Sequence, residues 1–235
     1  MLEVQTRVAI VGCGGLGVPA AWTLVAAGVR KLRLIDDDVV EASNLHRQVL
    51  YRERDCGAQK AEALAATLRK KAENQGFSLD VEVRNGRVEA GNTELHFNGC
   101  DAVIEGSDDA LCKFAVNDWA VSDRAGRAVR AAVIAAAIGR RGQWMVVAPG
   151  GACYRCLFED PPPAELLSSC QIAGVLGPVV AQVGALAARS LLRVLRGQPD
   201  MAHSALVRRL PAGFRTTAVL PAADCRCQRG WKACG

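Results

Sequence analysis

The chain has 235 residues, half of which are hydrophobic and only 23% charged, and its formal net charge is +5. This length and apolar content suffice for one large buried core, and they exclude an intrinsically disordered protein. The positive charge is spread along the sequence. We interpret its densest cluster, 69–71, as a solvated helix face, so no nucleic-acid partner is expected.

The first predicted elements form a nucleotide-binding βαβ unit. An apolar strand at 8–11 precedes a glycine-rich turn, a helix follows, and a second apolar run at 32–35 ends on Asp36. Glycines permit a tight turn and bring backbone N–H groups close to phosphate, where the helix amino terminus adds favourable charge. Asp36 would accept hydrogen bonds from a ribose. The glycines expected to contact phosphate are Gly12, Gly14, Gly15 and Gly17. This unit alone leaves open a dinucleotide or ATP.

The elements that follow continue an α/β pattern. We expect helices at about 60–74, 110–125 and 178–195, and strands near 79–83, 101–105, 129–135, 144–147 and 216–220. The predicted fold is a Rossmann-like, mostly parallel sheet flanked by helices. We expect one domain over 1–235: a nucleotide-binding part at about 1–149, then a crossover loop, a helix and a cysteine-rich tail at about 150–235.

The expected compartment follows from two features of the sequence. The first core strand begins at Val8, which leaves no room for a signal peptide. The longest apolar stretch, around 175–188, is interrupted by Gly177, Pro178 and Gln182, so we do not expect it to span a membrane. We expect a cytoplasmic protein with no membrane partner. The ten cysteines then suggest metal binding or thiol chemistry before disulfides.

A polar segment after Asp36 narrows the choice of nucleotide. Asn44, Arg47, Gln48 and Lys60 place amide and cationic groups on a segment that leaves the pocket. Arginine offers a bidentate fork to phosphate and lysine a compact point charge, which suits a triphosphate. Each of these residues taken alone could equally belong to an ordinary exposed helix.

Together these residues resemble a known family. The pattern Asp-x-Asp-x-Val-x-x-Ser-Asn-Leu-x-Arg-Gln at 36–48, followed by Gly-x-x-Lys at 57–60, is similar to that of the ThiF/MoeB/HesA adenylyltransferases, bacterial relatives of the ubiquitin-activating enzymes. The resemblance extends from Arg7 to the tail. It implies an ATP site in which Asp36 and Asp38 lie at the ribose end, Asn44 and Arg47 contact phosphates, Gln48 supports them, and Lys60 reaches the outer phosphates.

The resemblance also implies a magnesium ligand. The turn Gly106-Ser107-Asp108-Asp109 follows the strand expected at 101–105 and resembles the family's Thr-Asp-Asn turn. Asp108 would bind the Mg²⁺ carried by ATP, since hard oxygen ligands bridge this metal to phosphate. The alternative role of Asp108 is to cap the following helix. Arg47, Lys60 and Asp108 are therefore the expected catalytic residues.

Cysteine pairs suggest a structural zinc site. Cys153-Tyr154-Arg155-Cys156 has zinc-ligand spacing and resembles the family's Cys-Tyr-Arg-Cys, while the tail offers Cys225, Cys227 and Cys234. Four thiolates around zinc would pin the tail to the loop. The tail departs from the family's Cys-x-x-Cys, because one residue separates Cys225 from Cys227. We favour these two as ligands, with Cys234 as the substitute.

The other cysteines divide into two groups. Cys170 lies in a segment similar to the family's Cys-x-x-Ala-Gly-Val-x-x-Pro and precedes a helix, where a thiol tends toward a lower pKa. It is either a catalytic thiol or a structural residue. The others, expected to be small core residues, are Cys13, Cys56, Cys100 and Cys112.

The family resemblance implies a reaction and its partners. The chain would adenylate the carboxyl terminus of a small ubiquitin-like sulfur-carrier protein ending in Gly-Gly, and a sulfurtransferase could then help form a thiocarboxylate. A homodimer is also implied. The family's amino-terminal arginine helix is not found before the first strand, so Arg7 or the pair Arg140-Arg141 substitutes, the dimer is arranged differently, or activity is reduced.

Three alternatives stay open at this point. An NAD-dependent oxidoreductase would use the glycine turn and Asp36 but leaves Lys60 and Asp108 unexplained. A tRNA-modifying dehydratase of the same family would activate a small carboxylate. A degenerate docking module would bind a ubiquitin-like partner without turnover.

Overall fold

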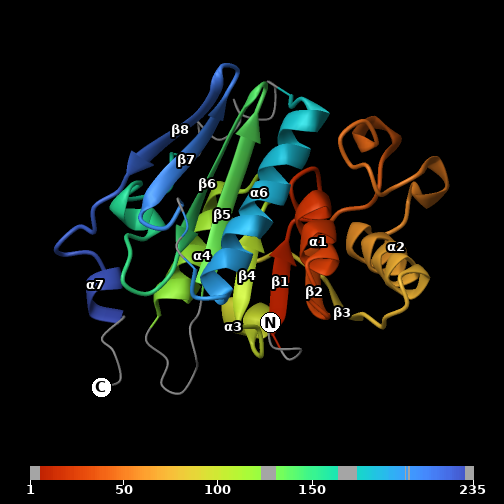
Figure 1. Ribbon diagram of the computed structural model, residues 1–235, viewed down its shortest axis with the longest axis horizontal. Coiled ribbons are helices and arrows are strands. Elements are labelled where there is room, and N and C mark those ends of the chain that lie inside the picture. Colours follow the sequence, from red (N-terminus) through yellow and green to blue (C-terminus); the bar gives the residue numbers. More distant parts are fainter. Residues whose placement is uncertain (1–5, 123–130, 164–173, 199, 201, 231–235) are drawn as a thin grey trace.

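One sheet organises the chain, and its strands are the apolar runs of the sequence. The computed structural model describes residues 6–122, 131–163, 174–198, 200 and 202–230. The strands are β1 (Arg7–Val11), β2 (Lys31–Asp36), β3 (Asp80–Asn85), β4 (Ala102–Glu105), β5 (Ala131–Ile138), β6 (Arg141–Val147), β7 (Ala205–Leu210) and β8 (Gly213–Ala218). They form an eight-stranded sheet in the order β3-β2-β1-β4-β5-β6-β7-β8 (Figure 1).

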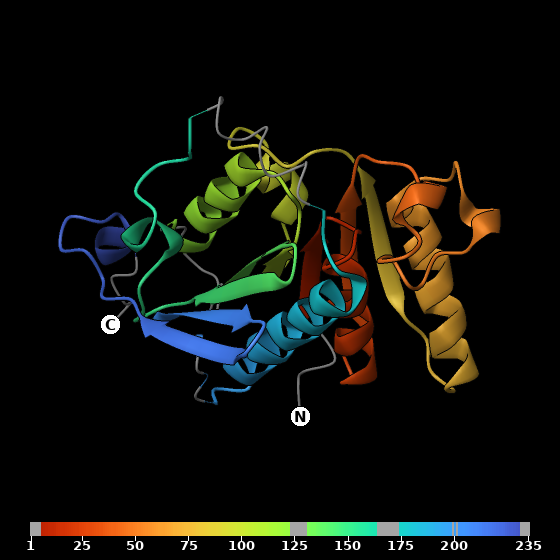
Figure 2. The same ribbon diagram turned by 90° about the horizontal axis from the view of Figure 1, so that it is seen from above.

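Helices cover both faces of this sheet. The helices are α1 (Gly17–Ala26), α2 (Lys60–Asn74), α3 (Thr93–Phe97), α4 (Ala110–Val121), α6 (Gly177–Leu195) and α7 (Cys227–Gly230). Side chains alternate along a strand, so Val8 and Ile10 join the core beneath α1, α2 and α6, while Ala9 and Val11 join the core beneath α3 and α4. Figure 2 shows α4 and α6 on opposite sides of the sheet. The central strands are therefore apolar on both faces.

The strand order creates a switch point between β1 and β4. After β1 the chain builds β2 and β3 on one side, and after β3 it returns to build β4 and β5 on the other, all in parallel. Ligands of open α/β sheets bind outside the carboxyl ends of the strands at such a point. The glycine turn follows β1 and the Ser107 turn follows β4, so both lie there.

The prediction of a Rossmann-like, mostly parallel sheet flanked by helices is confirmed. Strands β6, β7 and β8 are antiparallel additions, and β7 was not predicted. The strand expected at 216–220 lies at 213–218, and every residue of β8 is exposed. An edge strand exposed on both faces has no apolar alternation to reveal it in the sequence.

The helix predicted at about 178–195 is confirmed as α6. Pro178 stands in the first turn of α6, where proline is compatible with a helix, so the helix continues to Leu195. By length and composition α6 could cross a membrane, with a mean hydropathy of 1.3. Half of the apolar part of α6 is nevertheless buried inside the fold, as in the core helix of a globular domain. The length and composition of one such helix are therefore weak evidence for a membrane span.

Close packing of α6 against α1 generates a stability prediction. A Cβ on Gly184 would overlap the carbonyl oxygen of Leu16 and crowd Pro19. Alanine normally stabilises a helix interior by about 1 kcal/mol over glycine. Here we expect Gly184→Ala to destabilise the fold by about 2 kcal/mol, because the helices must separate.

Thermal and denaturant unfolding would measure this effect. The matched control is Gly91→Ala, since nothing lies within 4 Å of a Cβ at Gly91. The control should change stability by less than about 0.5 kcal/mol. A stabilised Gly184→Ala protein would contradict the packing described here.

Candidate functional site

The glycine turn is built around the carboxylate of Asp36. Asp36 ends β2 and is 9% exposed. Its Oδ2 accepts from the N–H of Cys13 at 2.6 Å, and its Oδ1 accepts from the N–H of Asp38 at 2.8 Å. Burial raises the pKa of Asp36, and these backbone N–H groups oppose the rise. Each oxygen keeps a further acceptor position, so the carboxylate can still bind ribose hydroxyls.

A buried amide lies against the glycine turn. Gln48 is 3% exposed, and its Oε1 has no hydrogen-bond partner within the described residues. A Cβ on Gly14 would lie 3.5 Å from Nε2 of Gln48, and a Cβ on Gly15 would lie 2.9 Å from Cγ2 of Val180. The surface formed by the glycine turn at 12–17 and Gln48, here called the phosphate cradle, thus has close-packed backbone where side chains would not fit. It also contains a buried polar atom without a hydrogen-bond partner among the described residues. Both features fit a bound nucleotide.

Lys60 reaches the same edge of the sheet from the start of α2. It is 6% exposed, and its Nζ donates to Oδ2 of Asp38 at 2.7 Å. The hydroxyl of Tyr51 shares its single proton between two carbonyl oxygens, that of Cys13 at 2.7 Å and that of Lys60 at 3.0 Å. Tyr51 therefore ties the segment that leaves Asp36 to the glycine turn. It is a positioning residue that sequence reasoning missed.

Asn44 and Arg47 lie on the intervening segment in a more open setting. The side-chain nitrogen of Asn44 donates to Oε2 of Glu41 at 3.3 Å. Arg47 is half-buried, and its Nη1 lies 3.4 Å from Nε2 of His46. Over the described residues Arg47 has no carboxylate partner. Its guanidinium is therefore available to an anion.

The turn after β4 separates two roles that the sequence left open. Asp109 caps α4, because its Oδ1 accepts from the N–H groups of Leu111 at 2.8 Å and Cys112 at 3.3 Å. Asp108 is exposed, and its carboxylate has no hydrogen bond or ion pair to the described residues. The cap is thus Asp109, which leaves Asp108 free for a cation.

A buried ion pair lies directly beneath this turn, and the sequence analysis did not identify it. Glu105 ends β4 with no exposed surface, and Lys113 of α4 donates to its Oε2 at 2.6 Å. Burial raises the pKa of Glu105, while Lys113 lowers it. The sequence does carry a signal for this pair. A glutamate ends a buried strand, and a lysine stands eight residues later among apolar residues of a helix.

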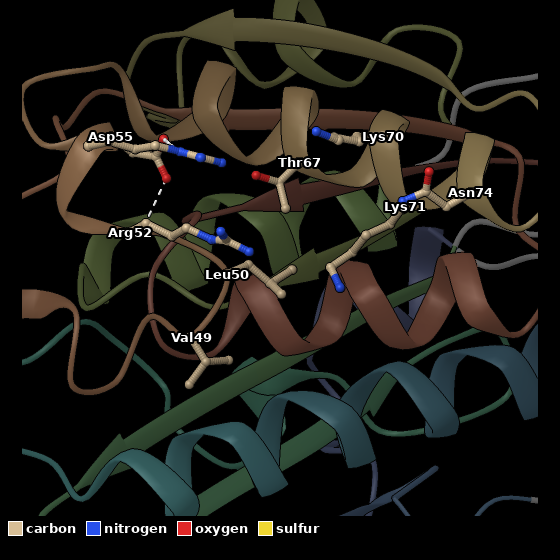
Figure 3. Close-up of a pocket in the computed structure, with 9 residues that line it drawn as sticks. Val49, Leu50, Arg52, Asp55, Thr67, Lys70, Lys71 and Asn74 are labelled. Atoms are coloured by element: carbon tan, nitrogen blue, oxygen red, sulfur yellow. Dashed lines mark hydrogen bonds and ion pairs between the residues drawn. The ribbon is translucent and has the colours of Figure 1, made fainter.

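A second hollow lies outside this constellation. It has a volume of about 340 Å³ and is lined by Val49, Leu50, Arg52, Arg54, Asp55, Thr67, Lys70, Lys71 and Asn74. Figure 3 shows that Thr67 and Lys70 extend from α2 on one side, with Arg52 and Asp55 on the loop opposite. Lys71 lies over the ring of Trp22 at 4.6 Å, so this part of the basic cluster is not simply a solvated face.

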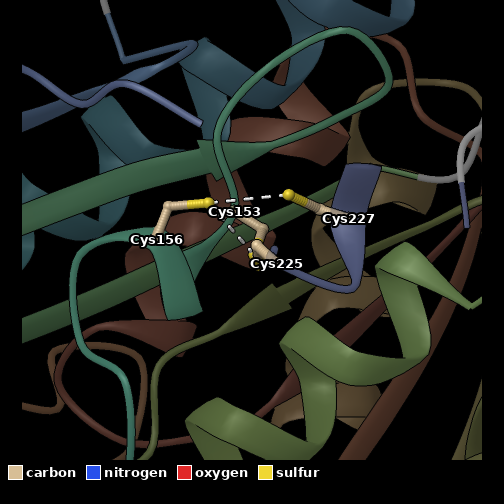
Figure 4. Close-up of side chains that lie close together, drawn as sticks. All are labelled: Cys153, Cys156, Cys225 and Cys227. Carbon is tan, nitrogen blue, oxygen red and sulfur yellow. Dashed lines mark hydrogen bonds between the residues drawn. The ribbon is translucent and has the colours of Figure 1, made fainter. Parts of the chain in front are cut away.

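The four expected cysteine ligands converge in space. Cys153 and Cys156 flank a short turn after β6, and Cys225 and Cys227 come from the tail (Figure 4). The Sγ–Sγ distances are 3.9 Å for Cys153–Cys156 and 3.5 Å for both Cys153–Cys225 and Cys156–Cys227. Zinc–thiolate bonds of about 2.3 Å in a tetrahedron separate the sulfurs by roughly 3.8 Å. The cluster therefore fits a closed four-thiolate metal site.

The cysteine turn is anchored to α4. Asn117 accepts from the N–H of Tyr154 at 2.7 Å, and Arg155 donates to both carboxylate oxygens of Asp118 at 2.7 and 2.9 Å. The guanidinium of Arg155 also lies 4.8 Å from the ring centre of Phe114. The same helix that begins beside Asp108 therefore holds the cysteine cluster.

The remaining cysteines partly contradict the prediction. Cys13, Cys100 and Cys112 are buried, as expected for small core residues, but Cys56 is exposed. The prediction for Cys56 was wrong because its neighbours form a polar surface loop closed by Val40 and Ala58. Cys170 and Cys234 lie outside the described residues.

Comparison with known proteins identifies relatives of the whole domain. The ThiF family model matches residues 4–228. The mouse (Mus musculus) protein named adenylyltransferase and sulfurtransferase MOCS3 is 42% identical over 193 residues, which is 81% of this chain and 40% of that protein. The SAMP-activating enzyme E1 of Haloferax volcanii is 37% identical over 195 residues, covering 82% of this chain and 68% of that enzyme. The chain thus spans about two fifths of the MOCS3 relative.

Solved structures share the fold. The crystal structure of E. coli MccB with ATP has a TM-score of 0.79 at 22% identity and covers 94% of this chain and 66% of MccB. The crystal structure of PaaA has a TM-score of 0.69 at 20% identity, covering 93% of this chain and 65% of that one. At these identities the likeness concerns the fold alone.

The thiol environments predict an order of alkylation. Burial raises the pKa of Cys100 to about 11 and also raises the pKa of Cys13. Near pH 8 only about one thousandth of Cys100 is then thiolate, the reactive form. We expect iodoacetamide to modify Cys56 in the folded protein and to leave Cys13 and Cys100 unmodified.

Peptide mapping by mass spectrometry would read this order. Full labelling of all three thiols in denaturant is the control. Modification of Cys100 as fast as Cys56 under native conditions would show that the core is more open than described.

Proposed function

Because this chain belongs to the ThiF family, we propose that it uses Mg²⁺–ATP to adenylate the carboxyl terminus of a small ubiquitin-like sulfur-carrier protein. Two relatives support this: one is named an adenylyltransferase and sulfurtransferase, and the other a SAMP-activating enzyme. Both align with most of this chain. A sulfurtransferase is the partner proposed for the sulfur-transfer step.

One observation supports the proposal: groups suited to the ribose, the phosphates and the Mg²⁺ of ATP lie at a single edge of the sheet. The glycine cradle and Asp36 lie there beside the unpartnered carboxylate of Asp108. Arg47 and Lys60 supply positive charge to the same edge. An oxidoreductase would leave these two cations and Asp108 without a role.

The proposed reaction needs positioning more than acid–base catalysis. A carboxylate oxygen of the carrier terminus attacks the α-phosphorus of ATP, and the bond from that phosphorus to the bridging oxygen breaks. Pyrophosphate leaves with the electron pair, and an acyl adenylate remains. A carboxylate is already a competent nucleophile, so alignment and neutralisation of developing charge supply most of the acceleration.

Each residue has a defined role in this proposal. Asp36 binds the ribose, the N–H groups of the glycine turn and Gln48 hold the phosphates, and Asp108 holds Mg²⁺. Arg47 and Lys60 neutralise the outer phosphates as pyrophosphate forms. Lys60 must share or release Asp38 to do so, because the two groups are 2.7 Å apart.

The cysteine cluster is proposed to hold one structural zinc ion. Four thiolates leave no open coordination position, so the metal would stabilise the tail rather than act on substrate. Backbone and side-chain N–H groups support the sulfurs: Ala222 donates to Cys156 at 3.4 Å and Gln228 to Cys227 at 3.2 Å. Bound zinc would keep these thiols ionised.

The remaining features of the function are proposals from family membership. The partner's terminus would be a thin Gly-Gly tail able to enter the cradle. A homodimer is the expected assembly, and Cys170 remains a candidate thiol for sulfur transfer.

Pyrophosphate exchange tests the reaction. With a ubiquitin-like protein ending in Gly-Gly, we expect ATP–pyrophosphate exchange that is absent without it. Asp108→Ala and Lys60→Ala should each lower the exchange rate at least about 100-fold, since each removes charge stabilisation of the transition state.

Lys70→Ala is the matched control, because Lys70 lies on the same helix as Lys60 but is exposed. It should retain near-full exchange. Exchange that survives both site substitutions would refute this assignment of the site.

Metal analysis tests the zinc proposal separately. The purified chain should carry one zinc, and Cys225→Ser should lose most of it because three thiolates bind far more weakly. Cys56→Ser, at an exposed cysteine outside the cluster, should retain the metal. A folded wild-type chain without metal would rule the site out.

A further inference from the structure

We propose that the buried Glu105–Lys113 ion pair positions the Ser107–Asp108 turn, so that Asp108 is correctly placed to bind Mg²⁺–ATP. This rests on the function proposed above, because Asp108 is the metal ligand there. Neither residue would touch the nucleotide.

The ion pair holds the turn at every polar backbone atom of Ser107. Nζ of Lys113 donates to Oε2 of Glu105 at 2.6 Å, to the carbonyl oxygen of Ser107 at 2.8 Å and to that of Ala135 at 3.0 Å. Oε1 of Glu105 accepts from the N–H of Ser107 at 2.8 Å and from its hydroxyl. The ends of β4 and α4 and the strand β5 are thereby joined at one point.

Lys113 is not available as a phosphate-binding cation. An ammonium has three donors, and all three are used within the fold, where the residue is 7% exposed. Arg47 differs in this respect, since its guanidinium has no carboxylate partner among the described residues. The charge of Lys113 acts on the turn rather than on the ligand.

Fold stability alone does not account for this pair. Replacement of a buried ion pair by apolar side chains of similar volume is often neutral or stabilising, because desolvation offsets the attraction. A network with every donor and acceptor satisfied instead fixes one geometry. Here that geometry is the backbone of the residue preceding Asp108.

The turn also contacts the phosphate cradle, so its position affects two parts of the site. Gly12 has a φ of +82°, and a Cβ there would lie 2.8 Å from the nitrogen of Ser107. A shift of Ser107 would therefore move Asp108 and disturb the glycine turn. Misplacement of a reacting group by about 1 Å can cost about 100-fold in rate.

Calorimetric binding of ATP, with Mg²⁺ and with EDTA, tests the proposal without a carrier protein. The apolar double variant Glu105→Leu/Lys113→Met should remain folded. We expect the ratio of the two Kd values, which measures the benefit of Mg²⁺, to fall at least about tenfold, while the Kd in EDTA changes less than about twofold. Asp108→Asn should reduce the same ratio.

Rescue and a second variant complete the test. Glu105→Asp/Lys113→Arg shortens the acid and lengthens the base, so it should restore the ratio more than either single change. If the apolar variant fails to fold, the isosteric Glu105→Gln variant tests the same prediction, a fall in the ratio of the two Kd values. A folded variant with the wild-type ratio, or equal weakening in EDTA, would overturn the proposal.

The outcome is separable from that of the proposed function. Wild-type protein that binds Mg²⁺–ATP but shows no carrier-dependent exchange would refute adenylation, while the Kd ratio still judges the pair. If Mg²⁺ does not improve the Kd of the wild-type protein for ATP, both the proposed function and the proposed role of the ion pair would be refuted.

Discussion

The contact between the turns after β1 and β4 is the constraint on which the candidate site depends. Both strands end at the switch point of the sheet, and their loops meet because Gly12 presents no side chain to Ser107. Adjacent parallel strands always bring their carboxyl ends together, but a residue with a Cβ would force the loops apart. In the function proposed above, the glycine turn and the free carboxylate of Asp108 would share one ligand because this contact is so close.

Helix α4 carries that constraint across the domain. Its first turn is capped by Asp109, its second is held by Lys113 against Glu105, and its third anchors the cysteine turn through Asn117. The Asp108 turn and the cysteine turn are thus both held by the same helix. A metal held by the cysteine cluster, as proposed above, would therefore be connected to the site through this helix.

Prediction from sequence succeeded where the signal was local. The glycine turn, Asp36 and the helix at 60–74 are encoded by spacing along a short segment, and the fold reproduces them. Prediction failed where the signal was weak or depended on distant packing. Strand β7 and the exposed Cys56 are such cases. The strand is apolar and buried only in its first half, and Cys56 is an apolar residue within a polar surface loop.

The sequence by itself determined the fold class and the nucleotide-binding unit, because periodicity and glycine positions act over a few residues. Only the tertiary structure decided which acid caps α4, that Cys225 meets Cys153 across 72 positions of the chain, and that Glu105 is paired with Lys113. The last two of these contacts join residues from different elements. Their formation depends on how the elements pack, which spacing along the chain does not specify.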